Sequence, residues 1–181
     1  HSINSIQYVS GIEGMVLITG SLDFRPALYY TVDDEKTWNH KLLPDDEYIF
    51  DCKVSKADSD KVVCMAEESF YIASLSEEDT RWQRAEIAGP EALVDFDLSP
   101  TDPNKWIVAY ADTYSNRYEY SAGFRITEDG GKTWQETGQN RLKAARLADF
   151  AFQKDANGTK YLIGVTDAGD FVKANIGTRT Y

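Results

Sequence analysis

Apolar residues along the chain occur in short runs, separated by clusters of glycine, proline, asparagine, aspartate and serine. Within many runs apolar and polar positions alternate with a period of two, which is typical of strands with one buried face. A helical period is weak and is confined to Gln139–Arg146, where we expect one turn of helix. The pattern predicts an all-β fold.

The predicted strands fall into four successive sets, each resembling a propeller blade of four antiparallel strands. Turn-forming segments such as Ser99–Asn104 and Lys154–Gly158 separate first from second strands. We therefore predict a single propeller segment over residues 1–181, with blades at about 1–45, 46–90, 91–141 and 142–181. The strands are expected at Ile6–Val9, Met15–Gly20, Ala27–Val32, Trp38–Leu43, Tyr48–Val54, Lys61–Ala66, Ser69–Ser74, Trp82–Ile87, Leu93–Leu98, Trp106–Ala111, Phe124–Thr127, Trp134–Thr137, Leu147–Phe152, Lys160–Thr166 and Asp170–Lys173.

Two segments, Thr31–Trp38 and Thr127–Trp134, align residue for residue as Ser/Thr-x-Asp-x-Gly-x-Thr-Trp. The one departure is Glu35, where the second copy has Gly131. The copies are 96 residues apart, and a degenerate third copy, Ser76–Trp82, lies near the midpoint. Self-similarity with a period of this length indicates a propeller or a solenoid.

Each residue type in this motif has a local physical reason. The Asp33 and Asp129 side chains can accept hydrogen bonds from the free N–H groups of a short turn between strands. Gly131 permits a positive φ without steric cost. Thr133 and Trp134 resume an extended strand, where the indole can cover the gap to a neighbouring unit.

The motif resembles the Asp-box, or BNR repeat, of sialidase-like propellers, sortilin-type sorting receptors and xyloglucanase-like glycosidases. This resemblance implies a structural role for the motif, away from the face that binds ligands. Such propellers close with more blades than this chain supplies, so the remainder of the propeller or a second copy is an expected partner. A small four-bladed closure is the alternative. The structural residues that the resemblance assigns are Thr31, Asp33, Thr37, Trp38, Trp82, Thr127, Asp129, Gly131, Thr133 and Trp134.

By the same resemblance, the loops between second and third strands lie on the ligand face. These are Gly20–Pro26 and Asp112–Ser121, and the second combines tyrosine with arginine as binding hot spots do. An aromatic loop folded over its own blade is the alternative. Phe24-Arg25-Pro26 partly matches the Phe-Arg-Ile-Pro motif of sialidases, although an exposed turn arginine is the simpler interpretation. The predicted ligand-binding residues are Arg25, Tyr114, Asn116, Arg117, Tyr118 and Tyr120.

Catalytic signals in the sequence are weak. His40 is the only internal histidine, which excludes a firm Ser-His-Asp assignment, and no metal or cofactor motif is present. We therefore expect a non-catalytic module that binds a protein, peptide or glycan without a cofactor. The alternative is part of a sialidase-like or xyloglucanase-like glycosidase, which needs two suitably spaced carboxylates. The candidate acids are Asp23, Glu67, Glu68, Asp95, Asp112 and Glu119.

The net charge of −11 argues against nucleic acid or an anionic membrane as the main partner. No apolar run approaches the roughly 20 residues of a membrane-spanning helix, so we expect no membrane insertion.

The only two cysteines, Cys52 and Cys64, fall opposite one another in a predicted hairpin centred near Asp58. They form either a disulfide or a pair of buried thiols. Asn157 begins an Asn-Gly-Thr glycosylation triplet. A disulfide and a glycan together favour a secreted protein or one in the lumen of the secretory pathway.

Overall fold

The computed structural model describes residues 2–9, 11–78, 81–87, 91–112, 121–143, 147–154, 156, 160–166 and 171–177. These residues form strands and turns without any helix. The helical turn expected over Gln139–Arg146 is wrong for its described part, because Gln135–Lys143 is a strand that pairs with Ser121–Thr127.

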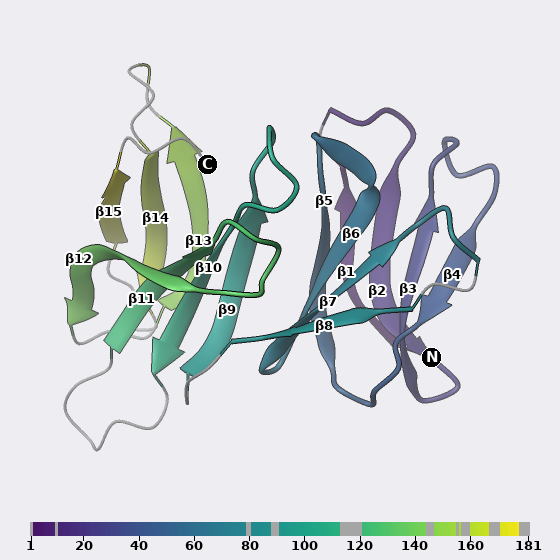
Figure 1. The fold of residues 1–181 in the computed structure, drawn as a ribbon, viewed down its shortest axis with the longest axis horizontal. Coiled ribbons are helices and arrows are strands. Elements are labelled where there is room, and N and C mark those ends of the chain that lie inside the picture. The colour runs from purple at the N-terminus through teal and green to yellow at the C-terminus, as the bar shows by residue number, and fades with distance from the viewer. Residues whose placement is uncertain are drawn as a thin grey trace.

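The strands form four separate antiparallel sheets, each in chain order (Figure 1). Blade one contains β1 (Ser2–Tyr8), β2 (Val16–Leu22), β3 (Arg25–Thr31) and β4 (Asn39–Leu42). Blade two contains β5 (Ile49–Ser55), β6 (Asp58–Ala66), β7 (Ser69–Ser74) and β8 (Gln83–Glu86). Blade three contains β9 (Glu91–Leu98), β10 (Trp106–Asp112), β11 (Ser121–Thr127) and β12 (Gln135–Lys143). Blade four contains β13 (Leu147–Lys154), β14 (Lys160–Thr166) and β15 (Phe171–Gly177).

The sheets follow one another as propeller blades and do not close into a circle, so the described structure is a partial ring (Figure 1). The all-β propeller prediction is thereby confirmed. Chain order explains the topology, because each short turn returns the chain beside the strand it has just left.

The first strand of every blade carries an irregularity at the same place. The register shifts between Ile3 and Ser5, between Ile49 and Asp51, and at the equivalent point of β9 and β13. One extra residue at such a bulge turns the following side chains to the opposite face. The four blades are therefore copies of one unit down to this local detail.

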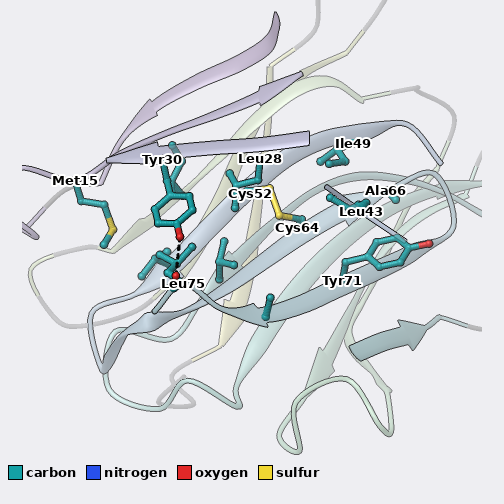
Figure 2. Packing of buried hydrophobic residues seen from close by; sticks show 14 residues of the cluster. Met15, Leu28, Tyr30, Leu43, Ile49, Cys52, Cys64, Ala66, Tyr71 and Leu75 are labelled. Carbon is teal, nitrogen blue, oxygen red and sulfur yellow. Dashed lines mark hydrogen bonds between the residues drawn. A yellow bond between two sulfur atoms is a disulfide. The ribbon is translucent and has the colours of Figure 1, made fainter. Parts of the chain in front are cut away.

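Two apolar cores lie between successive blades. The first joins blades one and two, and its members include Leu17, Leu28, Ile49 and Val62 (Figure 2). Tyr30, from blade one, donates its hydroxyl proton to the Leu75 carbonyl oxygen at 2.6 Å, so the one polar atom that it buries is satisfied.

The second core joins blades two and three and is aromatic. The ring centroids of Phe70 and Phe96 lie 5.3 Å apart, and those of Phe70 and Trp106 lie 5.9 Å apart. Trp134 stacks on Phe70 at 5.6 Å. Edge-to-face and offset aromatic contacts of this kind add to the stabilisation that burial provides.

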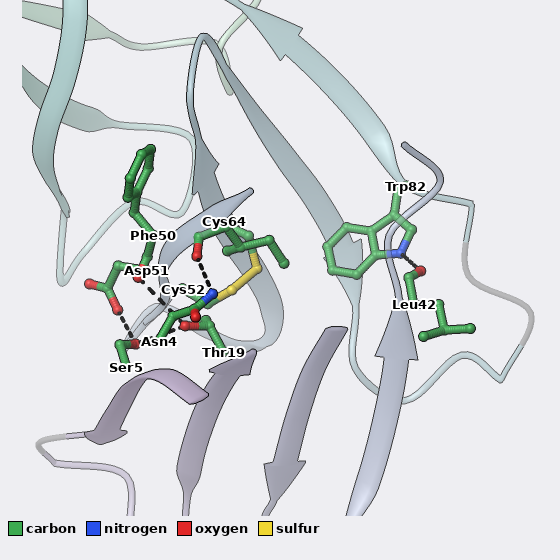
Figure 3. Close-up of a disulfide and its surroundings, with 10 residues drawn as sticks. Asn4, Ser5, Thr19, Leu42, Phe50, Asp51, Cys52, Cys64 and Trp82 are labelled. Atoms are coloured by element: carbon green, nitrogen blue, oxygen red, sulfur yellow. Dashed lines mark hydrogen bonds between the residues drawn. A yellow bond between two sulfur atoms is a disulfide. The ribbon is translucent and has the colours of Figure 1, made fainter. Parts of the chain in front are cut away.

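Cys52 and Cys64 are opposite one another on β5 and β6, as the hairpin prediction places them. The structure joins them in a disulfide within the first core, where both residues are fully buried (Figures 2 and 3). Of the two alternatives left by the sequence, the structure contains the disulfide.

Candidate functional site

The turn after β3 is organised by a single carboxylate. Asp33 accepts hydrogen bonds from the backbone N–H of Thr37 at 2.9 Å and from the Thr37 hydroxyl at 2.7 Å. It also accepts one from the Thr31 hydroxyl at 2.9 Å. The contacts from Thr37 are the main reason that the pKa of Asp33 is lowered to about 2.

The turn after β11 repeats this arrangement with matching atoms. Asp129 accepts from the Thr133 N–H at 2.9 Å, from the Thr133 hydroxyl at 2.6 Å and from the Thr127 hydroxyl at 2.8 Å. Its pKa is likewise lowered to about 2, first by the Thr133 hydroxyl. The structure thus brings together the threonine and aspartate residues that the repeat predicts, in two separate clusters.

Both turns are anchored to the loop between the first two strands of their blade. The Asp34 N–H donates to the Gly14 carbonyl oxygen at 3.2 Å, and the Gly130 N–H donates to the Asn104 carbonyl oxygen at 2.9 Å. The repeat turns and the loops between first and second strands therefore share one end of the blades. We call this the turn end.

The two turns differ at the position where the motif has its glycine. Gly131 has a φ of 87°, and a Cβ there would lie 2.7 Å from Ala85 Cβ and 2.9 Å from a ring carbon of Trp106. At the matching position of blade one, Glu35 takes a φ of 64°, although left-handed backbone is costly for a residue with a side chain. Its carboxylate accepts a hydrogen bond from the Tyr8 hydroxyl at 3.0 Å.

Two tryptophans tie neighbouring blades together. Trp82 donates its indole N–H to the Leu42 carbonyl oxygen of the preceding blade at 2.8 Å (Figure 3). Trp134 donates to the Glu86 carbonyl oxygen at 3.1 Å. Each tryptophan immediately precedes the fourth strand of its own blade, and its acceptor lies on the fourth strand of the blade before.

The degenerate turn of blade two obtains its carboxylate from elsewhere. Asp60, on β6, accepts from the Ser74 hydroxyl at 2.5 Å and from the Ser76 N–H at 2.7 Å. The Ser74 hydroxyl is the main cause of its lowered pKa. Sequence reasoning missed Asp60, because the acid that organises this turn is not part of the aligned repeat.

The opposite end of the blades is where the first strands begin, and we call it the strand-start end. There β2 and β3 meet in a two-residue turn of Asp23 and Phe24, with φ values of 49° and 67°. The loop predicted over Gly20–Pro26 is therefore shorter than expected, because two left-handed residues suffice to join twisted antiparallel strands.

Arg25 is an exposed residue at the start of β3, and its guanidinium donates to the Leu43 carbonyl oxygen at 3.3 Å. The predicted ligand residues Tyr114, Asn116, Arg117, Tyr118 and Tyr120 lie outside the described residues, as does Asn157.

An aromatic pair that the sequence did not single out occupies the strand-start end. Tyr48 is 47% exposed and Phe50 is 39% exposed, and their ring centroids lie 5.1 Å apart. Phe50 is the extra residue of the β5 bulge, which explains why it points away from the cores (Figure 3).

Two acids that precede this pair in the sequence, Asp45 and Glu47, are held by other side chains. Asp45 accepts from the Tyr71 hydroxyl at 2.7 Å, and burial together with this contact raises the pKa of Tyr71. Glu47 accepts from the Ser69 hydroxyl at 2.8 Å and from the Arg84 guanidinium at 2.5 Å.

A polar row also runs between the first strands of three blades. The Ser5 hydroxyl donates to Asp51 at 3.1 Å (Figure 3), and Lys53 Nζ lies 3.7 Å from Asp51 and 2.7 Å from Asp95. Lys53 also donates to the Phe96 carbonyl oxygen. Burial raises the pKa of the Asp51 carboxyl, and the Lys53 charge opposes that rise.

The described candidate catalytic acids lie in three different parts of the fold. Asp95 is committed to Lys53, and Glu67 and Glu68 are exposed in the turn between β6 and β7. Asp23 belongs to the tight turn already described, while the Asp112 side chain and Glu119 lie outside the described atoms.

Among the residues described, no cluster of three or more metal-ligating side chains is found. No helix in the described part of the chain has the length and apolarity of a membrane span.

Comparison with protein-family models gave no match, and comparison with curated proteins gave no significant match. The structure is similar to part of a GH74 xyloglucanase from Xanthomonas campestris, with a TM-score of 0.66 and 11% identity. That match covers 95% of this chain and 29% of the xyloglucanase chain, so this chain spans less than a third of that protein. An endo-1,4-beta-xylanase from Bacteroides thetaiotaomicron gives a TM-score of 0.46 at 11% identity, covering 97% of this chain and 76% of that one. At this identity the xyloglucanase similarity shows a β-propeller fold alone.

Proposed function

We propose that this chain is a segment of an Asp-box propeller that serves as a non-catalytic binding module for a protein or peptide ligand. The exposed Tyr48–Phe50 pair carries the proposal. Exposed aromatic side chains supply large contact area at a small cost in conformational entropy, which is why they are common in binding hot spots. The bulge that presents Phe50 fixes its direction.

The partners of three nearby acids support binding over catalysis. A glycosidase needs one carboxylic acid to protonate the leaving group and a second carboxylate as nucleophile or base. Asp45, Glu47 and Asp95 instead accept hydrogen bonds or pair with Lys53, so each has a structural partner. The contacts favour a stabilising role for these three acids.

We infer that the two turns are Asp-boxes, and their matching hydrogen bonds around Asp33 and Asp129 support this. The propeller is proposed to lie in the secretory pathway or outside the cell, where the Cys52–Cys64 disulfide persists. Glycosylation of Asn157 is proposed on the same ground, because its Asn-Gly-Thr triplet is processed only in that pathway.

A second candidate function is part of a glycoside hydrolase. The similarity to the GH74 xyloglucanase favours it, since the match extends over 95% of this chain. In this proposal the acid pair lies on polypeptide outside the described residues. Release of reducing sugar from xyloglucan or xylan by the native protein would favour this candidate over the first.

Peptide selection tests the binding proposal. A phage-displayed library of linear peptides is selected on the immobilised chain, and the affinity of a selected peptide is measured by fluorescence anisotropy. We expect Tyr48→Ala with Phe50→Ala to weaken binding at least about tenfold, the usual effect of losing a hot spot. The predicted loop is tested in parallel with Tyr118→Ala and Tyr120→Ala.

The matched control is Tyr8→Ala, which removes an exposed aromatic side chain at the turn end. It should leave the affinity unchanged, and all variants should keep the melting temperature of the parent chain. Unchanged affinity in both double variants would contradict the proposed ligand face.

A further inference from the structure

The face of blade one that points away from blade two is unlike the matching faces of blades two and three. Counted from the bulge, β1 places Ile3, Ile6 and Tyr8 on this face, where they pair with Gly20, Ile18 and Val16. These three side chains are 65%, 59% and 72% exposed.

The same three positions of the next two blades are covered. In blade two they are Ile49, Cys52 and Val54, at most 9% exposed in the core shared with blade one. In blade three the positions are likewise at most 9% exposed, in the core shared with blade two, and are occupied by Leu93, Phe96 and Leu98. Each of these triads is thus buried by the blade that precedes it in the chain.

The tryptophans that precede the fourth strands show the same difference between blade one and the next two blades. Trp82 and Trp134 pack against a core and donate to a carbonyl oxygen on the fourth strand of the preceding blade. Trp38 immediately precedes β4 in the same way, yet it is 45% exposed. Within the ranges that the structure describes, its indole N–H has no acceptor.

We propose that this face binds a complete propeller blade supplied by polypeptide outside this chain. The occupant covers Ile3, Ile6 and Tyr8 with an apolar sheet face. A main-chain carbonyl on its fourth strand accepts the Trp38 N–H, as the Leu42 carbonyl accepts that of Trp82. The interfaces between blades one and two and between blades two and three are therefore the templates for the proposed interface at this face.

Such a blade could come from a second copy of this chain or from a longer ring, and the strand that carries the tryptophan acceptor distinguishes the two. Both known acceptors lie on fourth strands, β4 and β8, whereas the described part of blade four has only the three strands β13, β14 and β15. Blade four, the terminal blade that a second copy would present, therefore offers no fourth-strand carbonyl among its described residues. A blade elsewhere in a longer ring does, and the match to 29% of the xyloglucanase chain shows the same fold within a longer polypeptide.

Glu35 adds a requirement for the occupant. At the matching position of blade three, Gly131 lies so close to Ala85 of the preceding blade that no side chain fits. Blade one has a glutamate there, held by the Tyr8 hydroxyl. The occupant must leave room beside Glu35 and present a hydrogen-bond donor or a cation to its carboxylate, because an unpaired buried charge is costly.

Hydroxyl-radical footprinting tests this proposal with the native protein, isolated together with any polypeptides that accompany it, and with the chain of residues 1–181 alone. We expect oxidation of Trp38 and Tyr8 to be several-fold lower in the native protein than in the isolated chain. Trp82 and Trp134 serve as internal controls and should react equally in both samples. Equal oxidation of Trp38 in the two samples would overturn the proposal.

Substitution separates docking from folding. Trp38→Ala should leave the melting temperature of the isolated chain unchanged and lower that of the native protein, whereas Trp82→Ala should lower both. An unchanged melting temperature for Trp38→Ala in the native protein would contradict docking at this face. A cross-link at Trp38 between ¹⁴N- and ¹⁵N-labelled copies of the chain would replace the proposed occupant with a second copy.

Discussion

The indole nitrogen of Trp134 lies 3.1 Å from the carbonyl oxygen of Glu86, 48 residues earlier in the chain. This contact ties the turn of one blade to the outermost strand of the blade before, and the indole ring stacks on Phe70 in the core between them. The repeat is therefore an interface element as much as a turn.

Replacing Trp134 should weaken the contact between blades two and three. We expect Trp134→Ala to lower the free energy of unfolding by about 2–3 kcal/mol, somewhat less than a fully buried tryptophan, because the residue is only partly buried. Trp134→Phe should recover most of the packing without the hydrogen bond. Urea titration followed by circular dichroism measures both, and a loss below about 0.5 kcal/mol for Trp134→Ala would contradict the assignment.

The two turn aspartates predict a stability change in acid. The pKa values of Asp33 and Asp129 are about 2 in the folded protein, below their ordinary value of 3.8. A lowered pKa contributes stability above pH 4 that is lost as the pH falls from about 4 to 2. Melting temperatures across this range should fall less steeply in the Asp33→Asn, Asp129→Asn double variant. Direct NMR titration of either carboxyl near pH 4 would refute the lowered values.

Glu35 and Gly131 form a matched pair of opposite predictions. Glu35→Gly relieves a left-handed backbone that costs about 1–2 kcal/mol, against the larger chain entropy of glycine, so we expect a small gain in stability. Gly131→Ala adds a Cβ 2.7 Å from Ala85 Cβ, and we expect a loss of about 3 kcal/mol. Thermal denaturation of both variants should give shifts of opposite sign.

Lys53 should matter more than an exposed lysine, because it neutralises two carboxylates between the first strands. Lys53→Met is expected to lower the free energy of unfolding by about 2 kcal/mol near neutral pH, since Asp51 would then be a largely buried charge without its partner. Burial has already raised the pKa of Asp51, so the loss should shrink as the pH falls and Asp51 becomes protonated. Adding Asp51→Asn should restore part of the loss at pH 7, and a loss independent of pH would argue against this account.

The disulfide should contribute measurably to stability. Cys52→Ala with Cys64→Ala is expected to cost about 3 kcal/mol, the usual magnitude for a loop of this length, plus the effect of the cavity left in the core. Intact mass after alkylation without reduction provides the check on its presence. Two alkylated cysteines in the unreduced protein would contradict the disulfide.

Much of this architecture could be predicted from the sequence because it depends on local patterns. Alternating apolar positions located the strands, and the spacing of the Asp-Trp repeats located the blades. The false helical turn over Gln139–Arg146 arose because the strand Gln135–Lys143 pairs with β11, a partner that the local pattern does not show.

The candidate site was less predictable, for physical reasons. The alternation of apolar and polar residues does not reveal a bulge. The exposure of Phe50 therefore could not be predicted from the strand expected over Tyr48–Val54. Asp60 acts on a turn from another strand, which only the fold reveals. The aromatic loop of residues 112–121 stays a prediction.

The disulfide also has a consequence for a chain exposed to proteases. Lys56 and Ala57 lie at the exposed tip of the hairpin between β5 and β6, with Cys52 before the tip and Cys64 after it. Trypsin cutting after Lys56 would produce two fragments that remain one molecule, since the cystine joins them across the cut. A gel run without reducing agent would therefore show an intact band, and the same sample after reduction would show two.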